Sequence, residues 1–240
     1  MWSGPRNIST AMMRSFENRP DCAVVDEPFY AAYLAATGLD HPMREAVLTS
    51  QPTDWRAVAD ALVAEAPAPV VYQKHMTHHM LPGFGLDWMA QCRNAFLIRD
   101  PARVVASYVR TRAEVTLADI GVVRQHELFE READRLGRAP PVVEGADVLA
   151  DPRGVLSAFC EALGIGFDEA MLEWPAGRRA SDGVWARAWY AAVERSTGFG
   201  PPEADRPPPL SDDLRRIVEA ARPHYEALAK WTIAAASRPR

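Results

Sequence analysis

Cysteine is scarce in this chain of 240 residues, which has only Cys22, Cys92 and Cys160. The three are far apart, odd in number and form no Cys-x-x-Cys pair. This pattern argues against a disulfide framework and against a zinc knuckle. We therefore expect the reducing environment of the cytoplasm.

Long apolar runs and excess positive charge are also missing. No run approaches the roughly 20 residues that a membrane-spanning helix needs, and no signal peptide is visible. Lys and Arg number 27 against 32 Asp and Glu, so the net charge is −5, which excludes a broad nucleic-acid surface. We expect neither a membrane nor a nucleic-acid partner, and the oligomeric state stays open. Any phosphate binding must come from a local cluster of arginines.

The composition present, 48% hydrophobic and 25% charged, is that of a globular protein, and we expect one domain over residues 1–240. Short apolar strand candidates alternate with helical patterns, which predicts an α/β three-layer sandwich with a central parallel sheet. The expected strands are 23–25, 69–73, 94–98 and 141–143. The expected helices are 9–18, 54–65, 101–112, 116–137, 152–163, 182–199 and 211–230. A stiff proline-rich connection, 201–209, precedes the C-terminal helical segment 210–235.

The first residues form a turn that opens into a helix. Gly-Pro at 4–5 breaks the chain, Arg6 and Asn7 follow, and Ser9 or Thr10 can cap the helix. Free amides at a helix start beside an arginine favour anion binding, although an ordinary capped helix explains the same residues. No Gly-Lys-Ser/Thr ending is present, so the loop is not of the Walker A type.

A strand should feed this loop, yet only Met1 and Trp2 precede Ser3. Two residues fall well below the usual five or six of a strand. Either the natural chain starts upstream of Met1 or the first strand is stunted, and the sequence does not decide between these.

A second candidate element follows the strand 94–98. Arg99 comes at its carboxyl end, where ligands bind in open α/β sheets. Asp100 is a plausible N-cap, Pro101 a good first helical residue, and Ser107 lies two helical turns further on. The arginine and the hydroxyl can clamp one phosphate. Alternatively, Arg99 pairs with a carboxylate such as Asp100 and Ser107 only fills the helix.

Together the two elements resemble the sulfotransferase family, and most closely its bacterial sulfotransferase-like group. That family has a P-loop-like fold and uses 3′-phosphoadenosine-5′-phosphosulfate (PAPS). Its Pro-Lys-Ser-Gly-Thr-Thr loop is similar to residues 5–10, with Arg6 in the lysine position and Ser9 and Thr10 as the paired hydroxyls. The resemblance implies that this loop, Asn7 included, holds the 5′ side of PAPS.

The family's 3′-phosphate element has Arg and Ser eight positions apart, as Arg99 and Ser107 are here. The resemblance implies that these two hold the 3′-phosphate. Arg178 and Arg179, in a late Gly-containing turn, are additional candidates for it. A solvated basic turn is the alternative for that pair.

Glu27 is the candidate base. The strand that contains residues 23–25 cannot continue past Pro28. Glu27 therefore lies at the carboxyl edge of the sheet. Sulfuryl transfer to a hydroxyl needs a base for the proton of the acceptor. Some relatives in the family carry Glu-Pro here with Glu as the base. The alternative is that Glu27 only pairs with Arg6 or Arg14.

Lys74 matches the lysine that cytosolic sulfotransferases place near the transferred group, but their histidine position holds Met76. His75, His78 and His79 remain alternatives for that role. No His-Glu-x-x-His arrangement accompanies them, so no metal is expected. The aromatic residues Trp185, Trp189 and Tyr190 either border an acceptor pocket or pack in the core.

The resemblance implies in-line transfer of a sulfuryl group from PAPS, as cosubstrate, to a hydroxyl or amine of a small-molecule acceptor. Arg6 would stabilise the leaving 5′-phosphate, Lys74 the sulfuryl oxygens, and Glu27 would accept the proton. One alternative is a non-catalytic nucleotide-binding module, because Ile8 replaces the loop glycine and Met76 the histidine. A small-molecule kinase using ATP fits less well, because no Walker ending or acidic Mg²⁺ ligand is evident.

Overall fold

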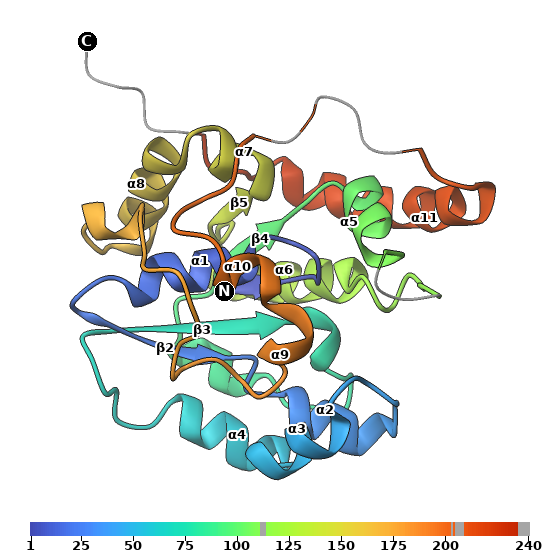
Figure 1. The fold of residues 1–240 in the computed structure, drawn as a ribbon, viewed down its shortest axis with the longest axis horizontal. Coiled ribbons are helices and arrows are strands. Elements are labelled where there is room, and N and C mark those ends of the chain that lie inside the picture. The colour runs from blue at the N-terminus through green and yellow to red at the C-terminus, as the bar shows by residue number, and fades with distance from the viewer. Residues whose placement is uncertain (111–113, 203, 205–208, 235–240) are drawn as a thin grey trace. The chain divides into compact units, whose positions relative to one another are not determined.

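The structure is a computed structural model that describes residues 1–110, 114–202, 204 and 209–234. The chain forms two compact units, and Figure 1 labels most of their helices and strands. The first unit comprises Met1–Ser9, Asn94–Phe167 and the described part of Phe199–Arg240, and the second comprises Thr10–Arg93 and Asp168–Gly198.

The first unit is built on a parallel sheet with the strand order β1-β4-β5. Its strands are β1 (Trp2–Ser3), β4 (Phe96–Ile98) and β5 (Val142–Glu144), and all three are buried. β1 is indeed only two residues long. It is held by its pairing with β4 and by a hydrogen bond from the Trp2 indole nitrogen to Asn94 Oδ1, 2.8 Å long.

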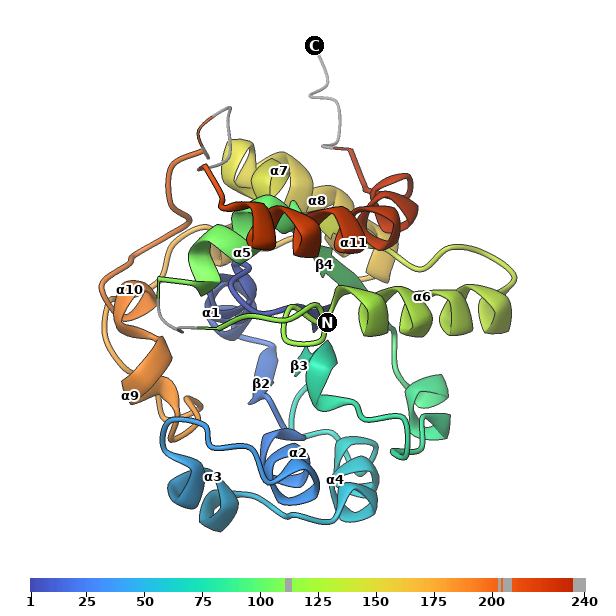
Figure 2. The same ribbon diagram turned by 90° about the vertical axis from the view of Figure 1, so that its right-hand side faces the viewer.

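Helices cover this sheet, and three of them share a hydrophobic cluster. They are α5 (Pro101–Tyr108), α6 (Val122–Leu136), α7 (Gly145–Ala150), α8 (Pro152–Leu163) and α11 (Asp212–Ala229). α5 begins as predicted, because the Asp100 side chain accepts the amides of Ala102 and Arg103 and Pro101 is in the first turn. α11 packs against α5 and α6, as Figure 2 shows. Val105 and Ala221 are among the buried residues that these three helices share.

The second unit contains the parallel pair β2 (Cys22–Asp26) and β3 (Val70–Met76). Their register sets Asp26 beside Lys74 at the carboxyl end of the pair. The α-helices of this unit are α1 (Ser9–Glu17, entered from the first unit), α2 (Tyr30–Thr37), α3 (Arg44–Ser50), α4 (Trp55–Leu62), α9 (Ala186–Trp189) and α10 (Ala191–Glu194). Short 3₁₀ helices are Thr77–His79, Asp87–Gln91 and Glu169–Met171. Figures 1 and 2 show α2, α3 and α4 together on one side of β2 and β3.

The predicted α/β class with a parallel sheet is confirmed, and each expected strand lies within three residues of its predicted bounds. Helix α11 matches the expected 211–230 closely. The expected helix 101–112 ends at Tyr108, with 111 and 112 outside the described residues. Of the proline-rich connection, residues 203 and 205–208 lie outside them too.

Two helix predictions are wrong. The expected helix 116–137 starts only at Val122, because Asp119 closes a turn on Thr116 and Gly121 adopts a left-handed φ of 68°. The expected helix 182–199 is broken into α9 and α10 at Tyr190. In the part of the chain that the structure describes, no helix is long and apolar enough to span a bilayer.

Candidate functional site

In the first unit, the loop after β1 turns at Arg6. This residue has φ 57°, in the left-handed region that costs a non-glycine residue on the order of 1 kcal/mol. Arg99 Nη1 donates a hydrogen bond to the Arg6 carbonyl oxygen. The residue after β4 therefore stabilises the strained turn of the loop after β1.

The same loop contacts helix α5 through its side chain. Arg6 Nε donates to Ser107 Oγ at 3.1 Å, and Arg110 Nη2 donates to the same oxygen at 3.2 Å. The two predicted phosphate elements thus meet in one cluster, which we call the arginine cluster: Arg6, Arg99, Arg110 and Ser107. Sequence reasoning missed Arg110, although its position three residues after Ser107 was the available signal.

The arginine cluster is electrostatically unfavourable on its own. Burial lowers the pKa of Arg6, and the positive charges of Arg110 and Arg99 lower it further. A bound anion would relieve this repulsion and receive charge-assisted hydrogen bonds from the guanidinium groups.

Asn7 shapes the loop. Its Nδ2 donates to the Leu97 carbonyl oxygen at 3.1 Å, while its Oδ1 accepts the Ile8 amide at 2.9 Å. Gly145 lies so close that a β-carbon there would be 2.8 Å from Asn7 Oδ1. Asn7 thus ties the loop to β4.

Ser9 and Thr10 are the first two residues of α1, so neither precedes the helix as its N-cap, contrary to the expectation. Ser9 is buried and Thr10 is half-buried. Because the helix begins directly after the loop, its first amides follow the strained turn at Arg6 within one helical turn.

In the second unit, Lys74 is the centre of a buried network. Its Nζ donates to Asp26 Oδ1 at 2.9 Å, to Glu27 Oε1 at 2.6 Å and to the Tyr190 hydroxyl at 2.6 Å. An ammonium group has three hydrogens, and all three are used inside the protein. Glu27 adopts a left-handed φ of 41°.

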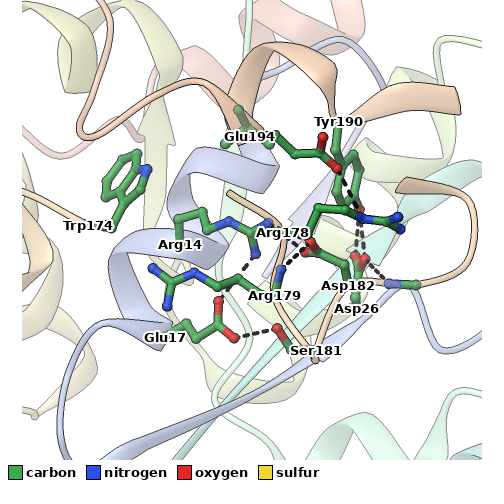
Figure 3. A network of polar contacts seen from close by, with 12 residues as sticks. Arg14, Glu17, Asp26, Trp174, Arg178, Arg179, Ser181, Asp182, Tyr190 and Glu194 are labelled. Carbon is green, nitrogen blue, oxygen red and sulfur yellow. Dashed lines mark hydrogen bonds and ion pairs between the residues drawn. The ribbon is translucent and has the colours of Figure 1, made fainter. Parts of the chain in front are cut away.

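The partner of Glu27 is therefore Lys74. Arg14, offered as an alternative partner from the sequence, is instead fully buried between Glu17, at 3.2 Å, and Asp182, at 2.7 Å (Figure 3). The structure brings Glu27 and Lys74 together. With them lie Asp26, which sequence reasoning did not assign to a site, and Tyr190, which it offered only as a border of an acceptor pocket or a core residue. Asp26 was detectable from its place beside Glu27, whereas nothing in the sequence linked Tyr190 to it.

The groups of this network shift one another's pKa values. Burial lowers the pKa of Lys74, but the carboxylates of Asp26 and Glu27 outweigh it and raise that pKa well above its ordinary value. Burial raises the pKa of Glu27, and the positive charge of Lys74 opposes this without cancelling it. Lys74 is thus a permanent cation, and Glu27 takes up a proton more readily than an exposed glutamate does.

The histidines that follow Lys74 pack among aromatic rings. Burial lowers the pKa of His75 and His79 well below the ordinary value, so both are neutral at physiological pH. His79 stacks on Tyr30 and Tyr33, with ring-centroid distances of 4.5 and 4.9 Å, and meets the His78 ring edge-on, with the centroids 4.4 Å apart. The described residues contain no group of three His, Cys, Asp or Glu side chains that could hold a metal ion.

Arg178 and Arg179 make contacts within the segment that contains them and its neighbour α10. Arg178 Nε lies 3.5 Å from Glu194 Oε1, and the Arg179 backbone amide donates to Asp182 at 2.8 Å (Figure 3). These contacts tie the segment before α9 together and fit the alternative of a structural basic turn.

The sequence pattern of the sulfotransferase domain family matches residues 1–232. In Arabidopsis thaliana, branched-chain-amino-acid aminotransferase-like protein 1 is 34% identical over 229 residues, which cover 95% of this chain but 40% of that protein. The chain therefore spans about two fifths of the length of that relative.

Solved structures share the fold. The sulfotransferase from Alicyclobacillus acidocaldarius superposes with a TM-score of 0.56 at 13% identity, covering 97% of this chain and 95% of its own. The sulfotransferase domain of the Synechococcus PCC 7002 olefin synthase gives a TM-score of 0.52 at 19% identity, covering 91% and 92%. These likenesses confirm the predicted topology. With the match over residues 1–232, they show that the chain belongs to the sulfotransferase domain family.

Proposed function

We propose that this protein transfers a sulfuryl group from PAPS to a hydroxyl or amine of a small-molecule acceptor. The observation that carries the proposal is the arginine cluster in a member of the sulfotransferase family. The guanidinium groups of Arg6 and Arg110 donate to the Ser107 hydroxyl, and that of Arg99 donates to the Arg6 carbonyl oxygen. The mutual repulsion of these three charges favours a multiply charged anion. A nucleotide with phosphates at its 3′ and 5′ positions is such an anion.

The nucleotide is bound by the loop after β1, by the element from Arg99 to Ser107 and by the start of α1. Arg99 and Ser107 hold the 3′-phosphate. The loop after β1 and the first helical amides hold the 5′ side, through Arg6, Asn7, Ser9 and Thr10.

The chemistry is assigned to the buried network. The bond between sulfur and the bridging oxygen breaks as a bond from sulfur to the acceptor oxygen or nitrogen forms, and the electron pair leaves with the 5′-phosphate. The proton of the acceptor goes to Glu27. Lys74 stabilises the sulfuryl oxygens after one of its three hydrogen bonds is released. Arginine and lysine supply the positive charge, so the scheme uses no metal.

Ligand-induced thermal shift tests the nucleotide assignment. Adenosine 3′,5′-bisphosphate at about 100 times its Kd should stabilise the fold by about 2.7 kcal/mol, which raises Tm by roughly 5–10 °C for a chain of this size. Arg99→Ala should weaken binding about 10- to 100-fold, since it removes charge-assisted contacts. Arg138→Ala, which removes an exposed arginine of the same unit, is the matched control.

Absence of a shift with the bisphosphate, or an unchanged shift in Arg99→Ala, would refute the PAPS assignment. A shift with ATP and Mg²⁺ alone would favour the kinase. Transfer of labelled sulfate from PAPS to a panel of hydroxyl and amine acceptors then tests turnover.

A second candidate function is a nucleotide-binding module without turnover. The observation that favours it is that all three hydrogens of Lys74 are engaged by the protein itself. This candidate predicts the same bisphosphate shift, with no sulfate transferred to any acceptor.

A further inference from the structure

The Tyr190 hydroxyl occupies a fully coordinated position in the buried network. It accepts hydrogen bonds from Lys74 Nζ at 2.6 Å and from Trp185 Nε1 at 3.2 Å. Its single proton is then available to Asp26, both of whose carboxylate oxygens lie 2.8 Å away. Figure 3 shows Tyr190, at the break between α9 and α10, directed at Asp26.

The carboxylate of Asp26 accepts more hydrogen bonds than that of its neighbour Glu27 does. Asp26 accepts from Lys74, from Tyr190 and, at 3.1 Å, from the Gly183 amide. Glu27 Oε1 accepts from Lys74 at 2.6 Å and lies 3.4 Å from the Tyr190 hydroxyl. Each additional donor favours the ionised form of a carboxylate, so the surroundings favour the anion at Asp26 more strongly than at Glu27.

We propose that Tyr190 is a positioning residue: by donating to Asp26, it fixes Asp26 as the ionised counter-ion of Lys74 and leaves Glu27 as the carboxyl that exchanges a proton. Its catalytic meaning rests on the proposed sulfuryl transfer, in which Glu27 takes the proton of the acceptor. Tyr190 acts through its neighbours and touches no reacting atom.

The charge balance of the network supports this division. One lysine and two carboxylates, all buried, carry one negative charge in excess when both acids are ionised. A single proton on one acid neutralises the network. The titratable groups that face Glu27 are Asp26, Lys74 and Tyr190. Among these influences, burial and the charge of Asp26 both raise the pKa of Glu27, while Lys74 lowers it.

Tyr190→Phe tests the proposal, since it keeps the ring that lies 4.9 Å from Lys74 Nζ and removes only the hydroxyl. Tyr72→Phe is the matched control: this tyrosine is on β3, two residues before Lys74, and its buried hydroxyl has no hydrogen-bond partner in the described residues. Carboxyl ¹³C NMR over pH 4–9 follows both acids, with resonances assigned through Asp26→Asn and Glu27→Gln.

We expect the carboxyl that titrates over this range in the wild type to be that of Glu27, whose resonance is the one missing from the spectrum of Glu27→Gln. Tyr190→Phe should move its midpoint up by about one pH unit and make the second carboxyl titrate as well. Tyr72→Phe should match the wild type. The proposal is overturned if the carboxyl that titrates in the wild type is that of Asp26, whose resonance is the one missing from Asp26→Asn, or if Tyr190→Phe leaves both titrations unchanged. The first criterion holds even if Tyr190→Phe fails to fold.

Kinetics separates this inference from the proposed function. With turnover, the acid limb of the kcat profile should move up by about one pH unit in Tyr190→Phe, with the KM for PAPS unchanged. The expected carboxyl titrations together with no sulfate transfer would uphold the placement of the proton and refute the sulfuryl transfer.

Discussion

At the scale of single residues, backbone strain coincides with the candidate chemistry. Among the described residues, three that are not glycine have positive φ, namely Arg6, Glu27 and Met43. Two of these are the residues that the family resemblance selects for the 5′ loop and for the base. Strained backbone persists where the surroundings over-determine it, here through Arg99 at the Arg6 carbonyl and Lys74 at the Glu27 carboxylate.

The buried ion pair between Arg14 and Asp182 gives a stability prediction at this scale. Asp182→Ala leaves a fully buried guanidinium with Glu17 alone, and removing one partner of a buried pair costs about 3–5 kcal/mol. Urea unfolding followed by tryptophan fluorescence measures this loss. Arg216→Ala, which breaks an exposed pair with Asp213, should stay within about 0.5 kcal/mol of wild type. A loss below 1 kcal/mol in Asp182→Ala would contradict the assigned importance of this pair.

The sequence identified pairs of residues that the structure brings into contact, although their roles stay predictions. Arg6 touches Ser107 across 101 positions and Lys74 touches Glu27 across 47. Resemblance to the family motifs selected these four. Arg6 and Glu27 follow the ends of β1 and β2, whereas Lys74 lies within β3 and Ser107 near the end of α5. Tyr190 was not detectable in this way, since its contact with Asp26 spans 164 positions and depends on tertiary folding alone.

At the scale of elements, the strands could be predicted from short apolar runs, because a strand buried in a parallel sheet appears in the sequence as a continuous run of hydrophobic residues. The expected helix 182–199 failed for a tertiary reason. Trp185 folds over Gly183, where a β-carbon would lie 2.1 Å from its ring, and Tyr190 turns to Asp26. These contacts outweigh the helical preference of the sequence, which periodicity alone cannot show.

The turn that follows the short strand β1 has no room for a side chain at Gly4, which gives a prediction at the scale of elements. A β-carbon on Gly4 would lie 2.5 Å from the carbonyl oxygen of Ile120, a backbone atom that cannot rotate away. Gly4→Ala should therefore lower the unfolding free energy by about 1–3 kcal/mol and reduce the thermal shift caused by adenosine 3′,5′-bisphosphate. Calorimetry with and without the nucleotide checks both.

Gly83→Ala is the control for this variant, because a β-carbon there meets no heavy atom within 4 Å. Equal melting temperatures for Gly4→Ala and Gly83→Ala would show that the exit of β1 adapts without strain.

At the scale of the whole molecule, the chain divides its candidate chemistry between two units. The first carries the arginine cluster and the second the buried network around Lys74. One sulfotransferase domain over residues 1–240 stays a prediction. A property of the whole fold that the structure does make testable is how its stability depends on pH.

Glu144, at the end of β5, should make a large contribution to the pH dependence of the unfolding free energy between about pH 4.5 and 7. Burial raises its pKa to about 7, although the Tyr225 hydroxyl, donating at 2.9 Å, opposes the change. The nearby charges of Asp147 and Asp100 raise it further. The ordinary pKa is 4.5, so between about pH 4.5 and 7 the folded protein binds more protons at this residue than the unfolded chain.

The unfolding free energy should therefore fall as pH rises through this window, by about 3 kcal/mol from Glu144. Glu144→Gln keeps an acceptor for Tyr225 but cannot titrate, so its stability should lack this decline. Urea unfolding of both proteins from pH 4.5 to 8 gives the difference curve, in which the contributions of Glu27, His75 and His79 cancel. Because the neutral amide resembles the protonated acid, the two proteins should be nearest in stability at pH 4.5, and Glu144→Gln should gain on wild type towards pH 8. Parallel curves would mean that Glu144 has the same pKa in the folded protein as in the unfolded chain.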